Sequence, residues 1–198
     1  MSRFLALFLF SLTAGLMAPE LKASPFDTIV IDPGHGGKDN GALWGGVKEK
    51  ELNLSVALRL KHLLESRGKR VVLTRSSDRF VSLEERCRIA NRYHRSLFLS
   101  LHFNAAPRLG ARGIETFYYG RRGRQLADQV HAHLLEGVDF YDRGIKRKRF
   151  HVLRGTRAPA VLVELGFLSN PVERKICAHP AYHDIVARQL ALAVLRYR

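Results

Sequence analysis

Apolar and polar residues follow two patterns along this chain. Short continuous apolar runs are typical of strands buried on both faces, and apolar residues three or four positions apart are typical of helices that bury one side. The runs predict strands at residues 26–32, 70–75, 96–105, 113–119, 149–154 and 158–167. The spaced pattern predicts helices at residues 51–68, 82–93, 124–138 and 182–194.

The regular exchange of strands and helices predicts the fold class. Successive parallel strands need a crossover, usually a helix, and the helices then cover both faces of the sheet. Gly68 marks one helix end, and Ser82 with Glu85 has the spacing of a capping box at the next helix start. The basic stretch at residues 142–150 is expected to form an exposed loop. We therefore expect one α/β domain of three layers around a largely parallel sheet.

The beginning of the chain has the pattern of an export signal. Arg3 precedes an apolar run at residues 4–18, and the small residue Ala23 stands where a signal peptidase would cut. We expect a signal peptide at residues 1–23 and the folded domain at residues 24–198, with an uncleaved anchor as the alternative. After processing no stable transmembrane segment would remain. The protein is expected in the periplasm, or otherwise in the extracellular space or cell wall.

The charge of the chain points to an anionic partner. Lys and Arg number 33 against 18 Asp and Glu, which gives a net charge of +15 and favours polyanions. Because an exported protein does not meet nucleic acid, we expect an anionic cell-wall or envelope polymer instead. The two cysteines, Cys87 and Cys177, lie far apart in sequence and outside any ligand-like cluster, so we expect neither pairing nor catalysis. A monomer is expected.

Several polar residues stand at the ends of the predicted apolar strands. His35 lies in "DPGHGG" after the first strand, His102 follows "LFLSL", and Glu164 interrupts "AVLVELGF". Glu49 and Glu51 both lie where the first long helix begins, and their positions do not distinguish them. A carboxylate at the tail of a buried strand needs a cation or hydrogen bonds. If the strands are neighbours, two imidazoles and two carboxylates surround one pocket.

These residue types predict metal-assisted hydrolysis of an amide. Two neutral imidazoles and a carboxylate are the ligand set of a catalytic zinc, whose fourth position is left for water. A second carboxylate could move the protons that amide hydrolysis requires. The chain has neither HExxH nor GxSxG, which argues against a zincin protease and a serine hydrolase. His151 is a candidate for a substrate contact near the same pocket.

Seven sequence blocks in order carry a resemblance to a known family. They are "IDPGHGGKDNGA", "KEKELNLSVALRL", "VVLTRSSD", "SLEERCRIAN", "LFLSLHFNA", "RFHVLR" and "PAVLVELGFLSN". From about residue 28 to its end the chain closely resembles the zinc-dependent N-acetylmuramoyl-L-alanine amidases of the amidase_3 type. The resemblance implies a mixed sheet of about six strands flanked by helices, with residues 24–198 as the catalytic domain.

The resemblance also implies an activity and a set of site residues. The expected substrate is peptidoglycan, cleaved at the amide between the lactyl group of N-acetylmuramic acid and L-alanine of the stem peptide. The zinc ligands fall on His35, Glu49 and His102, and Glu164 is the catalytic carboxylate that acts as general base toward the zinc-activated water. In this way the resemblance selects Glu49 over Glu51.

The sequence is also compatible with two other functions. A zinc carboxypeptidase or endopeptidase acting on the stem peptide would use the same residue types, and a wall-binding protein would retain them without catalysis.

Some division amidases of the family carry an inserted helix that plugs the zinc site. Here the strand at residues 113–119 leads almost directly into the next helix, so we expect an unplugged enzyme whose basic surface provides targeting.

Overall fold

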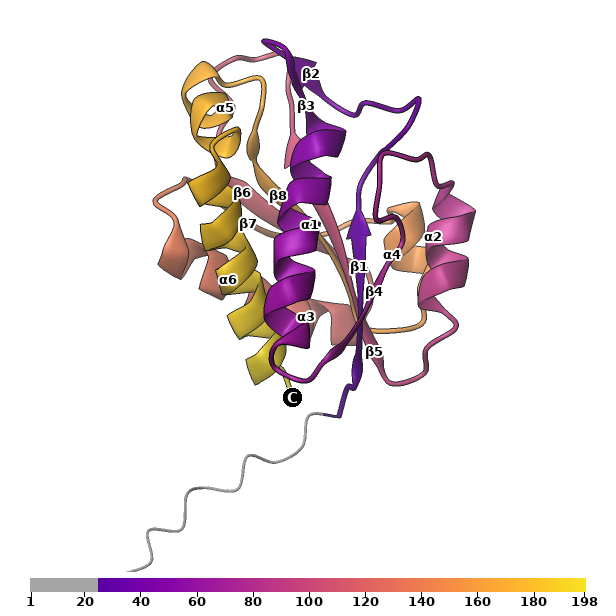
Figure 1. Ribbon diagram of the computed structural model, residues 1–198. Helices are drawn as coiled ribbons and strands as arrows, with labels where there is room; N and C mark the ends of the chain where they lie inside the picture. Colours follow the sequence, from indigo (N-terminus) through magenta and orange to yellow (C-terminus); the bar gives the residue numbers. More distant parts are fainter. Residues whose placement is uncertain (1–24) are drawn as a thin grey trace, which may run out of the picture.

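The computed structural model describes residues 25–198, and these form three layers around a six-stranded sheet in the order β4-β1-β5-β8-β6-β7 (Figure 1). Every neighbouring pair of strands is parallel except β6 and β8, which are antiparallel. The expected mixed, mostly parallel α/β sheet is therefore confirmed. The strands are β1 (Thr28–Pro33), β4 (Arg70–Leu73), β5 (Ser96–Asn104), β6 (Ile114–Tyr118), β7 (Asp142–Arg147) and β8 (Ala160–Phe167).

The helices cover the two faces of the sheet unequally. The helices are α1 (Glu49–Glu65), α2 (Leu83–Ala90), α3 (Arg121–Gly137), α4 (His151–Gly155), α5 (Pro171–Cys177) and α6 (Pro180–Arg196). The long helices α1, α3 and α6 pack on one face over the main apolar core. The short helices α2 and α4 pack on the other face over a smaller apolar cluster.

The register of the strands places the site at one edge of the sheet. β1 lies between β4 and β5, with Ile31 opposite Leu73 and Leu99. β8 follows on the far side of β5, where His102 is opposite Glu164. Because β1, β5 and β8 are parallel, the residues at their carboxyl ends meet at the same edge. The small hairpin of β2 (Leu43–Trp44) and β3 (Val47–Lys48) leads from there into α1.

Two local expectations were wrong. Residues 149–154 were expected as a strand, but they contribute to α4, because a short run with adjacent apolar residues has no distinguishing period. Residues 142–150 were expected as a loop, but residues 142–147 form the edge strand β7. Charged side chains are usual on an edge strand, and Ile145 alone packs against the core. Pairing with β6 therefore forms this strand without an apolar pattern.

Other features follow their sequence signals. The Ser82 hydroxyl accepts a hydrogen bond from the Glu85 backbone N–H at 3.2 Å, as the capping box predicts. Helix α5 was not predicted, although Asn170 and Pro171 are ordinary residues for a helix start. Cys87 and Cys177 are free thiols, buried in the clusters on opposite faces of the sheet.

The expectations for the start of the chain concern residues that the structure does not describe. The expected signal peptide at residues 1–23 lies outside the part of the chain that the structure describes. Among residues 25–198, no helix combines the length and the apolar character that crossing a membrane requires.

Candidate metal centre

The loop after β1 places His35 beside His102. His35 has a φ of +61°, a left-handed backbone conformation that non-glycine residues rarely adopt and that often marks functional sites. Gly34 lies against the His102 ring, because a Cβ atom built on it would be 2.2 Å from Cε1 of that ring. The two rings are 4.9 Å apart between centroids and nearly perpendicular, at 82°. Glycine at position 34 is therefore required for the two imidazoles to approach.

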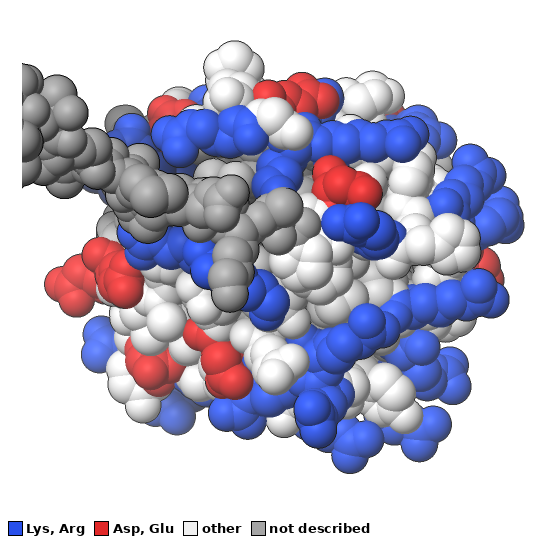
Figure 2. Space-filling view, turned by 90° about the horizontal axis from the view of Figure 1, so that it is seen from below, with Lys and Arg blue, Asp and Glu red and all other residues white. Residues whose placement is uncertain are grey.

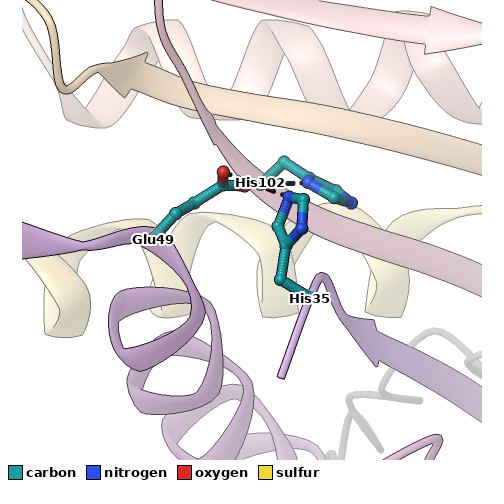
Figure 3. Close-up of side chains that lie close together, drawn as sticks. All are labelled: His35, Glu49 and His102. Atoms are coloured by element: carbon teal, nitrogen blue, oxygen red, sulfur yellow. Dashed lines mark hydrogen bonds and ion pairs between the residues drawn. The ribbon is translucent and has the colours of Figure 1, made fainter. Parts of the chain in front are cut away.

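Glu49, the first residue of α1, joins the two imidazoles (Figure 3). Its Oε1 lies 2.8 Å from Nδ1 of His102, and its Oε2 lies 3.1 Å from Nε2 of His35. Each of the three residues offers one possible ligand atom, and these three atoms all lie within 4.8 Å of one another. The alternative acid, Glu51, is exposed and pairs with Lys48 at 3.3 Å. The structure thus brings together His35, Glu49 and His102, and leaves Glu51 outside the cluster.

Further polar groups hold the Glu49 and His35 side chains in place. The Glu49 carboxylate accepts three more hydrogen bonds, from the backbone N–H groups of Ala42 and Phe103 and from the Asn53 side chain, at 2.9, 3.2 and 3.2 Å. The Nδ1 atom of His35 lies 2.8 Å from Oδ2 of Asp39. A carboxylate on the second ring nitrogen is the usual partner of a metal-binding histidine, because it fixes the tautomer and the ring orientation.

The electrostatics of the cluster favour a cation. Burial alone would raise the pKa of Glu49, but hydrogen bonds and charge from His102 and His35 hold this pKa well below its usual range. Burial lowers the pKa of His35, but the hydrogen bonds and negative charges of Glu49 and Asp39 outweigh it, so the net pKa is raised. The cluster therefore keeps a carboxylate ionised in a buried position and attracts positive charge to it.

Glu164 is the second carboxylate at this edge of the sheet. It stands opposite His102 on β8, and its Oε2 atom is buried with no hydrogen-bond partner among the described residues. Burial, followed by the negative charges of Glu49 and Glu115, raises the pKa of Glu164 well above its usual value. A buried carboxyl with an unused oxygen and a raised pKa is able to take up and release a proton.

These side chains face one pocket of about 550 Å³. His35, His102 and Glu164 line it on the polar side. Its remaining walls are mostly apolar and come from the segment before α2, from α4 and from β8; they include Phe80, Val81, Leu83, Phe150, Val152 and Leu162. His151 also lines the pocket, but from helix α4 and not from the expected strand.

A buried arginine from α2 fixes the loop that carries His35. Arg86 donates hydrogen bonds to Oδ1 of Asp32 at 2.6 Å and to the carbonyl oxygens of Pro33 and His35, both at 2.8 Å. Arg86 and Asp32 are both almost fully buried from solvent. Each charge therefore offsets the cost of burying the other. Sequence reasoning missed Arg86, because an arginine in the charged segment "EERCR" carries no sign that it is buried.

A second buried arginine supports the same loop. Arg75, which follows β4, donates to the carbonyl oxygens of Pro33 at 3.0 Å and of Gly34 and Lys50 at 2.8 Å each. It connects the His35 loop to the start of α1 and so to Glu49. Its sequence signal was available, since Arg75 is a charged residue at the end of the predicted apolar strand, a placement that the site residues share.

Comparisons with known proteins support this description. The sequence model of the amidase_3 family, described as N-acetylmuramoyl-L-alanine amidase, matches residues 29–196. N-acetylmuramoyl-L-alanine amidase LytC of Bacillus subtilis (strain 168) is 37% identical over 175 residues, which are 86% of this chain and 35% of LytC. N-acetylmuramoyl-L-alanine amidase CwlM of Bacillus licheniformis is 41% identical over 173 residues, which are 85% of this chain and 67% of CwlM.

A solved structure agrees with the sequence comparisons. The catalytic domain of CwlV, an N-acetylmuramoyl-L-alanine amidase from Bacillus (Paenibacillus) polymyxa var. colistinus, superposes with a TM-score of 0.84 at 35% identity. The match covers 87% of this chain and 98% of that domain. The chain therefore spans about a third of LytC and nearly all of the CwlV catalytic domain. With its seven sequence blocks, its fold and its clustered site residues in agreement, the chain belongs to the N-acetylmuramoyl-L-alanine amidase family.

Proposed function

We propose that this chain is a zinc-dependent peptidoglycan hydrolase that cleaves the amide between the lactyl group of N-acetylmuramic acid and L-alanine. The observation that carries the proposal is the cluster of His35, Glu49 and His102, whose ligand atoms lie within 4.8 Å of one another beside Glu164. The relatives support the choice of bond, because LytC, CwlM and CwlV are named N-acetylmuramoyl-L-alanine amidases.

The three side chains fit a zinc ion. Two imidazoles and a carboxylate are a catalytic zinc set, and zinc binds such atoms at about 2.0–2.2 Å, so a group this compact can share one ion. A Cβ atom on Gly41 would lie 2.4 Å from Oε2 of Glu49, so a larger residue there would displace a ligand. When bound, zinc supplies a water of near-neutral pKa and a Lewis acid for the scissile carbonyl oxygen. Asp39 holds the His35 ring in the orientation that leaves Nε2 facing the cluster.

Glu164 provides the proton transfers. Its unpartnered Oε2 accepts a proton from the attacking water, whose oxygen forms the new bond to the lactyl carbonyl carbon. The carbon–nitrogen bond then breaks, and Glu164 gives the proton to the nitrogen of L-alanine, which leaves as a free amine. Its raised pKa supports this role, because a carboxyl that binds a proton more readily is a better base toward water.

Product analysis tests the proposal. Muropeptides incubated with the protein should release intact stem peptides that begin with L-alanine, as identified by mass spectrometry. A chelator should stop the release, and added zinc should restore it. Shortened stem peptides still attached to the sugar would instead indicate a carboxypeptidase or endopeptidase. Retention on sacculi without any cleavage would indicate a wall-binding protein.

We also propose where the protein acts and how its chain is divided. Residues 1–23 serve as a signal peptide, and residues 24–198 act as the catalytic domain in the periplasm or otherwise outside the cell. The net charge of +15 supports an anionic component of the envelope as a second partner. Intact mass measurement on protein recovered from an envelope fraction should show a chain that begins at Ser24.

The enzyme works without an activator in this proposal. The connection between β6 and α3 consists of Tyr119 and Gly120, which is too short to hold a plugging helix. Purified protein should therefore digest isolated sacculi without added partners. Inactivity that a second envelope protein relieves would contradict this part of the proposal.

A further inference from the structure

The end of the molecule opposite the metal centre is strongly basic. Figure 2 shows this end, viewed from below in the orientation of Figure 1, with Lys and Arg side chains spread across it and fewer acidic ones. β1, β4, β5 and β8 begin here, and α3 starts here because β6 is antiparallel to β8. We call this surface the basic pole and define it by six exposed arginines: Arg70, Arg92, Arg121, Arg122, Arg154 and Arg157.

Contacts between segments far apart in sequence make the basic pole continuous. The Arg122 side chain donates to the Arg157 carbonyl oxygen at 3.2 Å, and the Arg157 backbone N–H donates to the Asn91 side chain at 2.8 Å. Two residues after Asn91 in sequence, the Tyr93 ring lies 5.0 Å from the guanidinium of Arg70. The arginines at positions 121, 122, 154 and 157 also line a single shallow groove. The six side chains therefore form one surface.

The charge of the basic pole is not balanced within the described chain. None of the six arginines forms an ion pair with a carboxylate of residues 25–198, whereas other surface arginines do, such as Arg59 with Asp184 at 2.6 Å. Arg121 and Arg122 also stand in the first turn of α3, which contains no acidic residue. Positive charge at a helix N-terminus is unfavourable for the helix. The positive charges of these arginines therefore gain no ion pair within the described fold and are suited to an anionic partner.

We propose that the basic pole docks on a membrane surface of anionic phospholipids. The arginines lie on several elements across one end of the molecule, which matches an extended layer of headgroups. An aromatic ring accompanies them, since Tyr93 lies under Arg70, and such rings are suited to the membrane interface. The docking rests on the proposed function only in requiring that the protein acts outside the cytoplasm.

The position of the chain termini supports a membrane as the occupant. The Asp27 backbone N–H donates to the Arg95 carbonyl oxygen at 3.1 Å, and Phe26 stacks on Tyr197 with ring centroids 5.5 Å apart. The described chain therefore begins at the basic pole. In the sequence, the apolar run at residues 4–18 ends a few residues before this point, so export by the proposed signal peptide delivers the pole next to the membrane.

Docking at this pole gives the enzyme an orientation. His102 is six residues along β5 from Ser96, which starts at the basic pole, and an extended strand covers about 20 Å in that distance. With the pole on the membrane, the pocket faces away from the lipid and toward the wall. The charge then holds the enzyme beside its substrate without occupying the site.

Vesicle sedimentation with matched variants tests the proposal. Residues 25–198 contain the whole sheet and both core clusters, so this chain is used together with the full-length chain as a second sample. The pole variant carries Arg121→Gln, Arg154→Gln and Arg157→Gln. The matched control carries Arg108→Gln, Arg112→Gln and Lys175→Gln, which remove the same charge from exposed positions of the loop after β5 and of α5. A third variant, the Lys variant, carries Arg121→Lys, Arg154→Lys and Arg157→Lys.

The expected result is specific for the pole and for the lipid. Wild type should bind vesicles that contain roughly one-third phosphatidylglycerol in phosphatidylcholine, and should not bind phosphatidylcholine alone. The pole variant should bind about 100-fold more weakly, since each basic residue near the surface contributes to binding, while the Lys variant and the control stay within about threefold of wild type. Raised salt should weaken the binding.

Three results would overturn the proposal. Equal losses in the pole variant and the control would show that net charge alone drives binding. Equal binding to both kinds of vesicle would show that lipid charge is not recognised. Binding to soluble polyphosphate at least as tight as to the vesicles, with the same dependence on the pole, would make an anionic polymer the partner. Cleavage of soluble muropeptides should be unchanged in all variants, so failure of docking is distinguishable from failure of the amidase assignment.

Discussion

The two faces of the central sheet differ within single strands. Along β5, Leu97, Leu99 and Leu101 enter the main core under α1, α3 and α6. The residues between and after them, Phe98, Ser100 and His102, point to the other face, where an apolar side chain gives way to a hydroxyl and then to an imidazole of the metal cluster. One strand therefore holds the fold together with one face and builds the site with the other.

Strand β8 repeats the same division. Val161, Val163 and Leu165 are fully buried in the main core, whereas Leu162 and Glu164 line the pocket. Burial of the apolar face stabilises the fold. The polar face carries a buried carboxyl oxygen without a hydrogen-bond partner, and the rest of the fold must offset the cost of burying it. Mutations at neighbouring positions of a strand should therefore affect different properties. On the apolar face they should lower stability, and on the polar face they should lower activity.

The largest expected effect is on the polar face. Glu49→Gln should remove the charge that holds the cation and lower amidase activity by at least about 10³-fold, with loss of bound zinc. Glu51→Gln is the matched control, because it changes the exposed acid two residues away and should leave zinc and activity unchanged. Zinc content by elemental analysis and turnover on muropeptides check both variants. Loss of zinc in Glu51→Gln alone would reverse the assignment.

The apolar face should respond in stability. Leu99→Ala removes a fully buried side chain and should lower the free energy of unfolding by about 2–5 kcal/mol, measured by denaturant titration. Activity per folded molecule should stay within about twofold of wild type, because the Leu99 side chain points away from the pocket. A loss of turnover in protein that is still folded would break the separation between the two faces.

A smaller effect is expected one contact away from the cluster. Asp39→Asn keeps the shape of the side chain that holds Nδ1 of His35 but removes its charge. Zinc affinity should fall by about 10–100-fold, as measured by competition with a chelating dye, and excess zinc should restore most of the activity. Unchanged affinity would mean that the His35 ring is oriented by its strained loop alone.

The smallest effect is a pH dependence of stability. The pKa of Glu164 is raised in the folded chain, so above its ordinary value near 4.5 the folded chain retains a proton that the unfolded chain has released. This site therefore destabilises the zinc-free protein increasingly as the pH rises from about 4.5 toward the raised pKa. Zinc-free Glu164→Gln should exceed zinc-free wild type in Tm by more than about 2 °C at pH 8 and by less than about 1 °C at pH 4. Equal Tm values at pH 8 would contradict the raised pKa.

The pattern along the strands explains why so much could be predicted from the sequence. β1, β5 and β8 are long apolar runs, and these runs predict the α/β sheet. The polar residues at the ends of these runs are easily recognised. Their positions predict that His35, His102 and Glu164 meet at one edge of the sheet. The choice of Glu49 over Glu51 came from the family resemblance, because both acids lie in the same helical turn.

The features that the sequence did not predict depend on tertiary contacts. β7 has a charged sequence and exists because it pairs with β6, and α4 is too short to show a helical period. Arg86 is buried because Asp32 and two loop carbonyl oxygens surround it. The segment "EERCR" around it is mostly charged and gives no indication of that environment.

The most direct test of the account is the pair of zinc content and turnover in Glu164→Gln, measured beside His102→Gln. The account predicts about one zinc per chain in Glu164→Gln and a loss of turnover on muropeptides of about 10²–10⁴-fold, while His102→Gln loses zinc and turnover together. Turnover in zinc-loaded Glu164→Gln equal to that of wild type would contradict it.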